Sequence, residues 1–277
     1  MRHYHVPFAW RGPGDWGDMA QDLSLLQLVQ AGTLDLRVAA LLWLGMERRA
    51  SVIVAALPRL AGKTTLLSAL RDLLPPGVEV VYTRGQREDF SFVAHTDPGR
   101  TYVLCNEISP HLPTYLWGNR VRVLFETLAR GYALGATMHA DSPEEVVAAL
   151  EGPPLLVPAE AMARVTFIVN LYAEDGPAGV VRRVSQVTLA APSRGADPYR
   201  LLPVAWWEPI SDTFAWAQSP DAAQALEARL GFPQSLGHEM VRREGLLARW
   251  LADEGTGPVE MRRQVLAHYN GEKAEEC

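Results

Sequence analysis

Apolar residues recur along the chain with strand spacing and helix spacing in turn, and their order predicts alternating strands and helices. The clearest case begins with a β-branched run over residues 51–56, which passes through a tight turn into the sequence G-K-T-T at 62–65. Leucines follow this loop at helical spacing, at Leu66, Leu67, Leu70 and Leu74. The stretch predicts a strand, a loop and a helix in direct succession.

Five further runs have the length and composition of strands. They cover residues 78–83, 101–107, 133–138, 166–172 and 180–189. A weaker alternation over 90–95 predicts one more short strand. The acidic Gly-Pro turn at 174–177 joins the last two runs into a closing hairpin.

Amphipathic runs predict helices between and after these strands. They cover residues 18–32, 35–49, 119–130, 221–230, 236–252 and 259–269. Thr33 is expected to cap the second of these helices. Ser142, followed by Pro143 and by Glu145 three residues after the cap, marks one more helix start. Strands alternating with helices predict an α/β fold with a mostly parallel sheet.

Composition and charge narrow the class of protein. The 277 residues carry a net charge of −6, which gives no electrostatic reason to expect nucleic acid as a partner. Cys105 and Cys277 are the only cysteines, so a disulfide framework is excluded and a reducing, cytoplasmic location is expected. The N-terminal residues lack the apolar stretch of a signal peptide, and no apolar run approaches the roughly 20 residues of a membrane span.

The G-K-T-T loop has the residue types that bind phosphate. A helix start offers unpaired N–H groups and the positive end of the helix dipole, so Ala61, Gly62, Lys63, Thr64 and Thr65 are expected to hold a nucleotide. The Lys63 ammonium would reach the β- and γ-phosphates, and the Thr64 hydroxyl would ligate Mg²⁺. The chain has only one other lysine, which indicates that position 63 requires a compact charge.

One position departs from the full phosphate-loop pattern. The first glycine of G-x-x-x-x-G-K-[ST] would fall at position 57, which is a leucine in this chain. If the backbone at Leu57 has a positive φ, the strain is about 1–2 kcal/mol, or roughly tenfold in affinity. If φ there is negative, little is lost.

Charged residues follow three of the predicted strands, at the sheet edge where ligands of open parallel sheets bind. Glu107 ends the run 101–107, where a carboxylate can hold Mg²⁺ or orient the attacking water. His139 follows the run 133–138 and is placed to read a γ-phosphate. Arg84, Glu88 and Asp89 follow the run 78–83 and are expected to contact nucleotide or its metal ion, with an ordinary solvated loop as the alternative.

These segments together resemble the ATPases of type II and type IV secretion and of type IV and Tad pili, over about residues 23–189. The loop at 62–67 looks like that family's phosphate loop, and 106–108 is similar to its second nucleotide motif. The sequence A-T-M-H-A-D-S at 136–142 is similar to its histidine box and is the most specific match. The hairpin from Phe167 to Val184 looks like the family's closing hairpin.

The resemblance implies a RecA-like core that binds ATP and Mg²⁺, with Lys63, Glu107 and His139 as catalytic residues and Thr64 and Glu107 at the metal. It divides the chain into an N-terminal arm with linker helices (1–50), a nucleotide-binding domain (51–191) and a C-terminal helical region (192–277). By the same resemblance, a divergent short member without the family's large N-terminal domain is expected. The helical region is expected to cap the sheet, with a docking surface for a partner as the alternative.

The resemblance also implies a hexameric ring at the inner face of the cell membrane, working on an inner-membrane platform protein. Neighbouring subunits of such rings supply arginines to the site. The candidates here are Arg84, Arg87, Arg120 and Arg122.

Two alternatives to a hydrolysing motor remain open. Leu57, Asn106 and Ser109 differ from the family's pattern, so the chain could be a nucleotide-binding structural or regulatory subunit that does not hydrolyse ATP. An unrelated phosphate-loop kinase or transferase is disfavoured, because the sequence has no lid or acceptor motif and the histidine box would be unexplained.

Overall fold

A single twisted sheet organises the part of the chain that the structure describes. The structure is a computed structural model, and it describes residues 22–58, 60–176, 179–193, 195–253 and 256–275. Its strands are β1 (Val52–Ala55), β2 (Glu79–Tyr82), β3 (Thr101–Ile108), β4 (Ala133–Met138), β5 (Phe167–Gly176), β6 (Gly179–Pro192), β7 (Tyr199–Glu208) and β8 (Thr213–Trp216). They lie in the order β2-β3-β4-β1-β5-β6-β7-β8.

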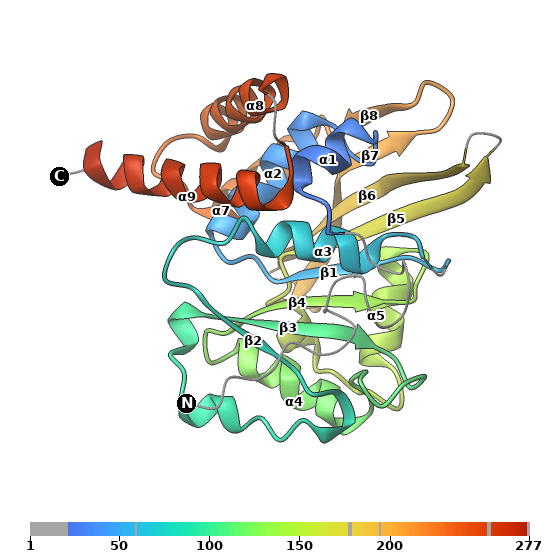
Figure 1. Cartoon of the computed structure of the whole chain (residues 1–277). Coiled ribbons are helices and arrows are strands. Elements are labelled where there is room, and N and C mark those ends of the chain that lie inside the picture. The colour runs from blue at the N-terminus through green and yellow to red at the C-terminus, as the bar shows by residue number, and fades with distance from the viewer. Residues whose placement is uncertain (1–21, 59, 177–178, 194, 254–255, 276–277) are drawn as a thin grey trace.

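The sheet has a parallel half and an antiparallel half that meet at β5. Strands β2, β3, β4, β1 and β5 pair in parallel, and β5 to β8 pair antiparallel through successive hairpins. Figure 1 shows the β5–β6 hairpin extending beyond the ends of the parallel strands. The predicted α/β core with a mostly parallel sheet and a closing hairpin is therefore confirmed.

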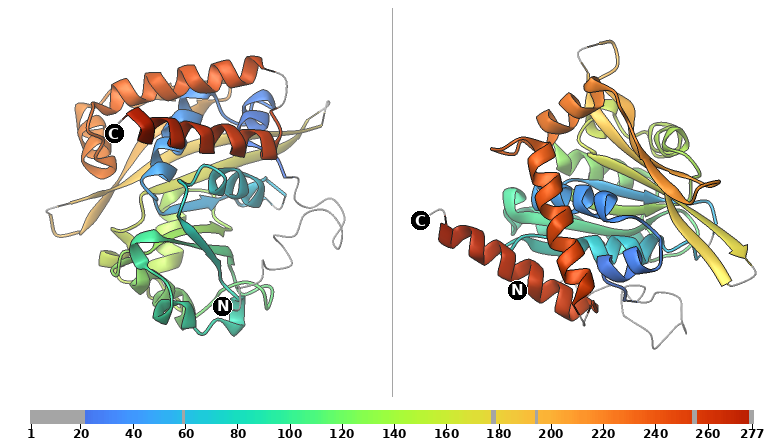
Figure 2. Two further views of the ribbon diagram at one scale, coloured as in Figure 1. Left: turned by 60° about the vertical axis from the view of Figure 1, so that its left-hand side comes forward. Right: turned by 90° about the horizontal axis from the view of Figure 1, so that it is seen from above.

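Helices cover both faces of the sheet, as Figures 1 and 2 show. They are α1 (Leu25–Gln30), α2 (Leu36–Glu47), α3 (Lys63–Arg71), α4 (Asn119–Leu128), α5 (Pro143–Glu151), α6 (Ala159–Met162), α7 (Pro220–Leu230), α8 (Leu236–Ala252) and α9 (Pro258–Glu275). One core cluster joins α1, α2, α3, α7, α8 and α9 to one face, and a second joins α4, α5 and α6 to the other. None of the described helices has the length and apolar character needed to cross a bilayer.

Strand β1 lies at the centre of this arrangement because its side chains serve both cores. Val52 and Val54 belong to the core on the α3 side, and Ile53 and Ala55 to the other. Parallel strands buried on both faces read as continuous apolar runs, which is the pattern at 52–55. On neighbouring β4, a Cβ on Gly135 would lie 2.9 Å from Leu67 Cδ1, so the missing side chain lets α3 approach the sheet.

Several predicted elements differ from those observed. The helix over 36–47 is capped by Asp35, whose carboxylate accepts from the amide of Val38 at 2.7 Å, and not by Thr33. The weak alternation over 90–95 forms a short 3-10 turn, Ser91–Ala94, so the strand predicted there is wrong. The predicted arm and the start of the first helix lie outside the described residues.

The C-terminal region also contributes strands that its composition did not predict. Strand β6 runs to Pro192, so the boundary expected at 191/192 falls inside a strand, and β7 and β8 extend the same sheet. The cap that Ser142 forms on α5 is as predicted, since its hydroxyl accepts from the amide of Glu145 at 3.1 Å. Cys105 is a core residue as expected, and burial raises the pKa of its thiol to about 12.

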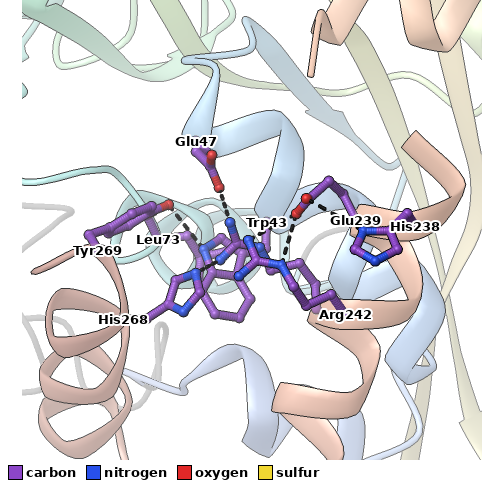
Figure 3. A network of polar contacts seen from close by, with 9 residues as sticks. Trp43, Glu47, Leu73, His238, Glu239, Arg242, His268 and Tyr269 are labelled. Carbon is purple, nitrogen blue, oxygen red and sulfur yellow. Dashed lines mark hydrogen bonds and ion pairs between the residues drawn. The ribbon is translucent and has the colours of Figure 1, made fainter. Parts of the chain in front are cut away.

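Helices α8 and α9 are attached to α2 by a buried polar network (Figure 3). The Arg243 guanidinium is fully buried over the Trp43 ring, at 4.6 Å, and its Nη2 pairs with the Glu47 carboxylate. Its Nη1 also contacts Nε2 of His268. The Tyr269 hydroxyl accepts from the Trp43 indole N–H at 3.0 Å and donates to a backbone carbonyl at the end of the α3 segment.

Replacing Arg243 should therefore loosen the C-terminal helices. Arg243→Met keeps the volume but leaves the carboxylate of Glu47 without its buried cation, so we expect a loss of roughly 3 kcal/mol in the free energy of unfolding. Arg249→Met, on the exposed face of the same helix, should change it by less than about 0.5 kcal/mol. Denaturant titration followed by circular dichroism measures both. Equal losses in the two variants would contradict the role of the network.

Candidate functional site

The segment between β1 and α3 is the predicted phosphate loop, and it has the predicted structure. Gly62 is the N-cap of α3 with φ 94°, a left-handed conformation that favours glycine, and Lys63 is the first helical residue. No side chain caps this helix end. Its first amides are consequently available to an anion, at the positive end of the helix dipole.

Lys63 is the buried cation of this loop. Its side chain is 7% exposed, and its Nζ lies 3.2 Å from the carbonyl oxygen of Ala56 and 3.4 Å from that of Pro58. Burial lowers the pKa of Lys63 below 10.5, and the charge of Glu107 partly offsets this effect. The ammonium thus contacts carbonyl oxygens and lies in the field of the Glu107 carboxylate, and within the described part of the chain it forms no ion pair.

Glu107 reaches this site from an irregularity near the end of β3. The pairing of β3 with β4 shifts register between Cys105 and Ile108, so Asn106 and Glu107 form a bulge. The Thr137 hydroxyl on β4 donates to the Asn106 carbonyl and supports the bulge. The Glu107 side chain is almost fully buried, and its Oε1 lies 3.3 Å from Nε2 of His139, although the contact lacks hydrogen-bond geometry.

His139 joins the acid to the lysine. Its Nδ1 lies 3.4 Å from Lys63 Nζ and 3.3 Å from the carbonyl oxygen of Leu57, while Nε2 faces Glu107. A neutral ring carries one proton: on Nδ1 it can be donated to the Leu57 carbonyl, and on Nε2 it points toward the Glu107 carboxylate. Three segments that are far apart in the sequence therefore meet as a chain of contacts: lysine, imidazole, carboxylate.

The strand order explains this meeting. Strand β4 lies between β1 and β3, so a residue following β4 can bridge groups that follow the other two. Neighbouring strands are about 4.8 Å apart, so the ends of β1 and β3 lie roughly 10 Å from each other. The side chains of Lys63, His139 and Glu107 together span this distance. The three predicted catalytic residues are thus brought together, although their catalytic roles stay predictions.

Leu57 does not have the strain that a missing glycine could cause. Its φ is not positive, and its side chain is 59% exposed, pointing away from the core. Among the described residues of the loop, Leu60 has a left-handed backbone with φ 60°, as Gly62 does. The loop thus accommodates leucine at position 57 because its turn is made three residues later.

The residues after β2 lie farther from the loop and contact one another. Strand β2 is the third strand from β1, roughly 14 Å across the sheet. The buried Glu88 carboxylate accepts from the amides of Arg84 and Phe90, at 2.8 and 2.7 Å. Asp89 accepts from the Ser91 amide and pairs with the Arg84 guanidinium, and these contacts lower its pKa to about 2. Their contacts hold this loop together, and a role in binding nucleotide stays a prediction.

The four arginines expected to act between subunits have different surroundings. Arg84 pairs with Asp89, Arg120 donates to the Glu88 carbonyl at 3.2 Å, and Arg122 faces Glu126 at 3.7 Å along α4. Arg87 is exposed, in the 3-10 turn after β2.

Three residues near the site have contacts that the sequence did not predict, and one of them, Ser109, was noted only as a departure from the family's pattern. Ser109 Oγ lies 2.6 Å from Nδ1 of His111, whose ring stands edge-on to His139 at 6.2 Å. The Arg182 side chain, from β6, donates to the Leu60 carbonyl of the phosphate loop at 3.0 Å. A Ser-x-His sequence just after a strand-ending acid was the available signal for the first two. The contact of Arg182 spans 122 residues of sequence and had no local signal.

Some of the buried polar atoms without a hydrogen bond lie at the same edge of the sheet. Of nine such side-chain atoms in the described part of the chain, four belong to this edge: Glu107 Oε1, Asn106 Nδ2 and both side-chain polar atoms of Asn170. They lie in the last residues of β3 or, for Asn170, opposite Ala55 at the end of β1. Such groups cost free energy unless water or a ligand satisfies them, so their position favours a binding site here.

The side chains present fit a hydrated Mg²⁺ bound with phosphate. Among the described residues, no three His, Cys, Asp or Glu side chains gather into a metal cluster. Mg²⁺ takes most of its ligands from phosphates and water, with one or two protein oxygens. Thr64, at the start of α3, and Glu107 with its unpartnered oxygen could supply these.

Two curated relatives match the chain, both from Methanocaldococcus jannaschii and both of unknown function. The uncharacterized protein MJ1287 is 27% identical over 209 residues, covering 69% of this chain and 77% of the relative. The uncharacterized protein MJ0900 is 23% identical over 275 residues, covering 89% of this chain and 49% of the relative. The chain therefore spans about half the length of MJ0900.

Solved structures give more distant similarities. The VirB11 ATPase of the Brucella suis type IV secretion system, in complex with sulphate, is 18% identical with a TM-score of 0.42, over 60% of this chain and 56% of that one. A second solved structure, also an ATPase domain, is 10% identical with a TM-score of 0.26, over 62% of this chain and 86% of that one. No protein-family model matches the chain.

Proposed function

We propose that this chain binds and hydrolyses ATP as the motor of a secretion or pilus-assembly apparatus. The observation that carries the nucleotide chemistry is the chain of contacts from Lys63 through His139 to Glu107, at 3.4 and 3.3 Å. It lies beside a helix start with uncapped amides. Lysine, imidazole and carboxylate around an anion-binding helix end suit a triphosphate with its attacking water.

Lys63 and the amides of the loop hold the phosphates in this proposal. The contacts of Nζ with the carbonyls of Ala56 and Pro58 are 3.2 and 3.4 Å, longer than charge-assisted bonds usually are. A phosphate oxygen would be a stronger partner for the ammonium than these carbonyls. Binding would then draw Lys63 away from His139 and free the Nδ1 of that ring.

Glu107 and His139 handle the water in this proposal. The carboxylate has a buried oxygen without a hydrogen bond, so it can accept from a water and orient it for attack on the γ-phosphate. His139, once released by Lys63, can contact the γ-phosphate and register its loss. Mg²⁺ bound through Thr64 and Glu107 would neutralise charge on the phosphate oxygens.

The assembly role rests on the sequence resemblance to secretion and pilus ATPases. By that resemblance the chain would form a hexameric ring and act on an inner-membrane platform protein. The exposed Arg87 is free of local ion pairs with the described residues, which suits a residue that acts on a neighbouring subunit's nucleotide.

A nucleotide-binding subunit that does not hydrolyse ATP is the second candidate. The observation that favours it is Ser109, which pairs with His111 and puts no permanent cation beside Glu107 where the resembling family has arginine. This candidate predicts binding without turnover by the purified chain.

Substitution of Lys63 and Glu107 separates binding from turnover. We expect Lys63→Ala to weaken ATP binding at least tenfold, because it removes the buried phosphate cation. Glu107→Gln should retain binding and lower turnover by about 10²-fold or more, because the amide cannot act as base. Phosphate release and equilibrium binding of a fluorescent ATP analogue measure the two effects, with light scattering to record the oligomer in the same sample.

Lys273→Ala is the matched control, because Lys273 is the other lysine of the chain. It should leave both measurements unchanged. Binding by the wild type without turnover would favour the second candidate. Turnover that survives Glu107→Gln would remove Glu107 from the mechanism.

Leu57→Gly tests whether the missing glycine impairs the loop. Because φ at Leu57 is not positive, glycine there relieves no strain, and affinity for ATP should stay within about twofold of the wild type. Equilibrium binding of the fluorescent analogue measures this. An affinity gain of tenfold or more would mean that Leu57 obstructs the nucleotide.

The lowered pKa of Lys63 predicts a pH limit on binding. The ammonium is needed for phosphate, so affinity should be steady near neutrality and fall as pH rises through the lysine pKa, which burial places below 10.5. Binding titrations from pH 7 to 10 measure this fall in affinity. The arginine of Lys63→Arg keeps its charge over the whole range, so any affinity that this variant retains should not fall as the pH rises.

A further inference from the structure

Arg182 approaches the phosphate loop from the side opposite to Glu107 and His139. Its Nε donates to the Leu60 carbonyl at 3.0 Å, and its Cδ would be 3.5 Å from a Cβ on Gly62. The residue is half-buried on β6, two positions before Val184, which packs in the core on the α3 side. The guanidinium therefore borders the loop that precedes α3.

The terminal nitrogens of this guanidinium remain available. Within the described residues, Nε alone makes a hydrogen bond, and no carboxylate pairs with Arg182. Its neighbour Arg183 is different, because its Nε and Nη2 donate to the two carboxylate oxygens of Asp212, each at 2.8 Å. Arg182 is thus a half-buried cation whose Nη1 and Nη2 groups can donate to an anion at the nearby start of α3. Arginine binds phosphate through such paired donors.

The strand order fixes which end of a nucleotide Arg182 would meet. Glu107 and His139 follow β3 and β4 on one side of β1, and they mark the γ-phosphate end. Strands β5 and β6 lie on the other side of β1, so a triphosphate running along the loop directs its nucleoside toward β6. In Figure 1 the β5–β6 hairpin extends past the end of β1 on that side.

We propose that Arg182 binds the α-phosphate of the nucleotide within the same subunit and so sets the direction in which the nucleotide lies. This inference rests on the proposed nucleotide site and adds a residue to it. Arg182 is a binding and positioning residue, since the reacting atoms lie at the other end of the triphosphate. The Nε contact with Leu60 holds the side chain in place while its two Nη groups bind phosphate.

The test compares ATP with ADP, which share the α-phosphate and differ at the γ-phosphate. Arg182→Gln should weaken equilibrium binding of both nucleotides by a similar factor of about tenfold, the usual size of a charge-assisted contact. Arg183→Gln makes the same charge change one residue along the strand, and it should alter either affinity by less than about twofold. Thermal unfolding of each variant checks that the chain is folded.

Two further measurements separate a phosphate contact from a purely structural link to Leu60. For a phosphate contact, the difference between wild type and Arg182→Gln should shrink as salt is raised from about 50 mM to about 500 mM, because mobile ions screen exposed charge. Arg182→Lys should keep both affinities within about threefold of the wild type. A difference independent of salt, with the lysine variant as weak as the glutamine variant, would overturn the proposal.

The remaining outcomes are also decisive. Loss of ATP affinity alone would put Arg182 at the γ-phosphate and overturn the assigned direction. Unchanged affinities, or equal losses in Arg182→Gln and Arg183→Gln, would overturn it as well. If the wild type binds neither ATP nor ADP, the proposed function itself fails, and this result is distinct from wild-type binding that Arg182→Gln leaves intact.

Discussion

One constraint governs the site: β4 lies between the strand that carries the phosphate loop and the strand that carries the acid. If β3 were next to β1, the carboxylate of Glu107 would pair directly with Lys63, and a strong buried ion pair would compete with phosphate. With β4 between them, the imidazole of His139 separates the charges while keeping both in contact. The lysine therefore stays available to a ligand, and the acid stays available to water.

This arrangement costs stability in the absence of ligand. Burial lowers the pKa of Lys63, and Glu107 and Asn170 keep buried polar atoms without hydrogen bonds. Each unsatisfied group lowers the free energy of unfolding by about 1–3 kcal/mol. The hydrophobic cores on the two faces of the sheet offset this loss. The network around Arg243 and Trp43 attaches the C-terminal helices to the core on the α3 side. A site with unmet polar groups gains more from binding than a satisfied one would.

The sequence predicted well those features that local chemistry determines. The strand Ala133–Met138 was predicted with its observed bounds, because an apolar run ends there at a histidine and a capping serine. Gly62 and Lys63 have the positions that a strand, loop and helix require. Thr33 and Asp35 are both good capping residues. Which of them caps α2 depends on the residue at which the helix begins, and the spacing of apolar residues does not determine that residue.

Features set by pairing between distant segments could not be predicted. Strands β7 and β8 are rich in tryptophan, and Pro203 interrupts β7, so their alternation is weak. The pairing of β7 with β6 and of β8 with β7 defines them. The bulge at Asn106 and Glu107 likewise exists only relative to β4. Residues 90–95 alternate like a strand, yet they form the 3-10 turn Ser91–Ala94 and pair with none of the described strands, although β2 is an edge strand of the sheet.

The antiparallel half of the sheet is best understood through its contact with the loop. Leu60 has a left-handed backbone that costs an L-residue about 1–2 kcal/mol, and its side chain is exposed, so no packing of its own holds the turn. Among the described residues, the side chain of Arg182 donates to the Leu60 carbonyl itself, and Lys63 and His139 contact carbonyls earlier in the same loop. Since β6 also pairs with β7, a change in the loop's shape would act on the hairpin and on the strands beyond it. The hairpin is thus a structural part of the candidate nucleotide site.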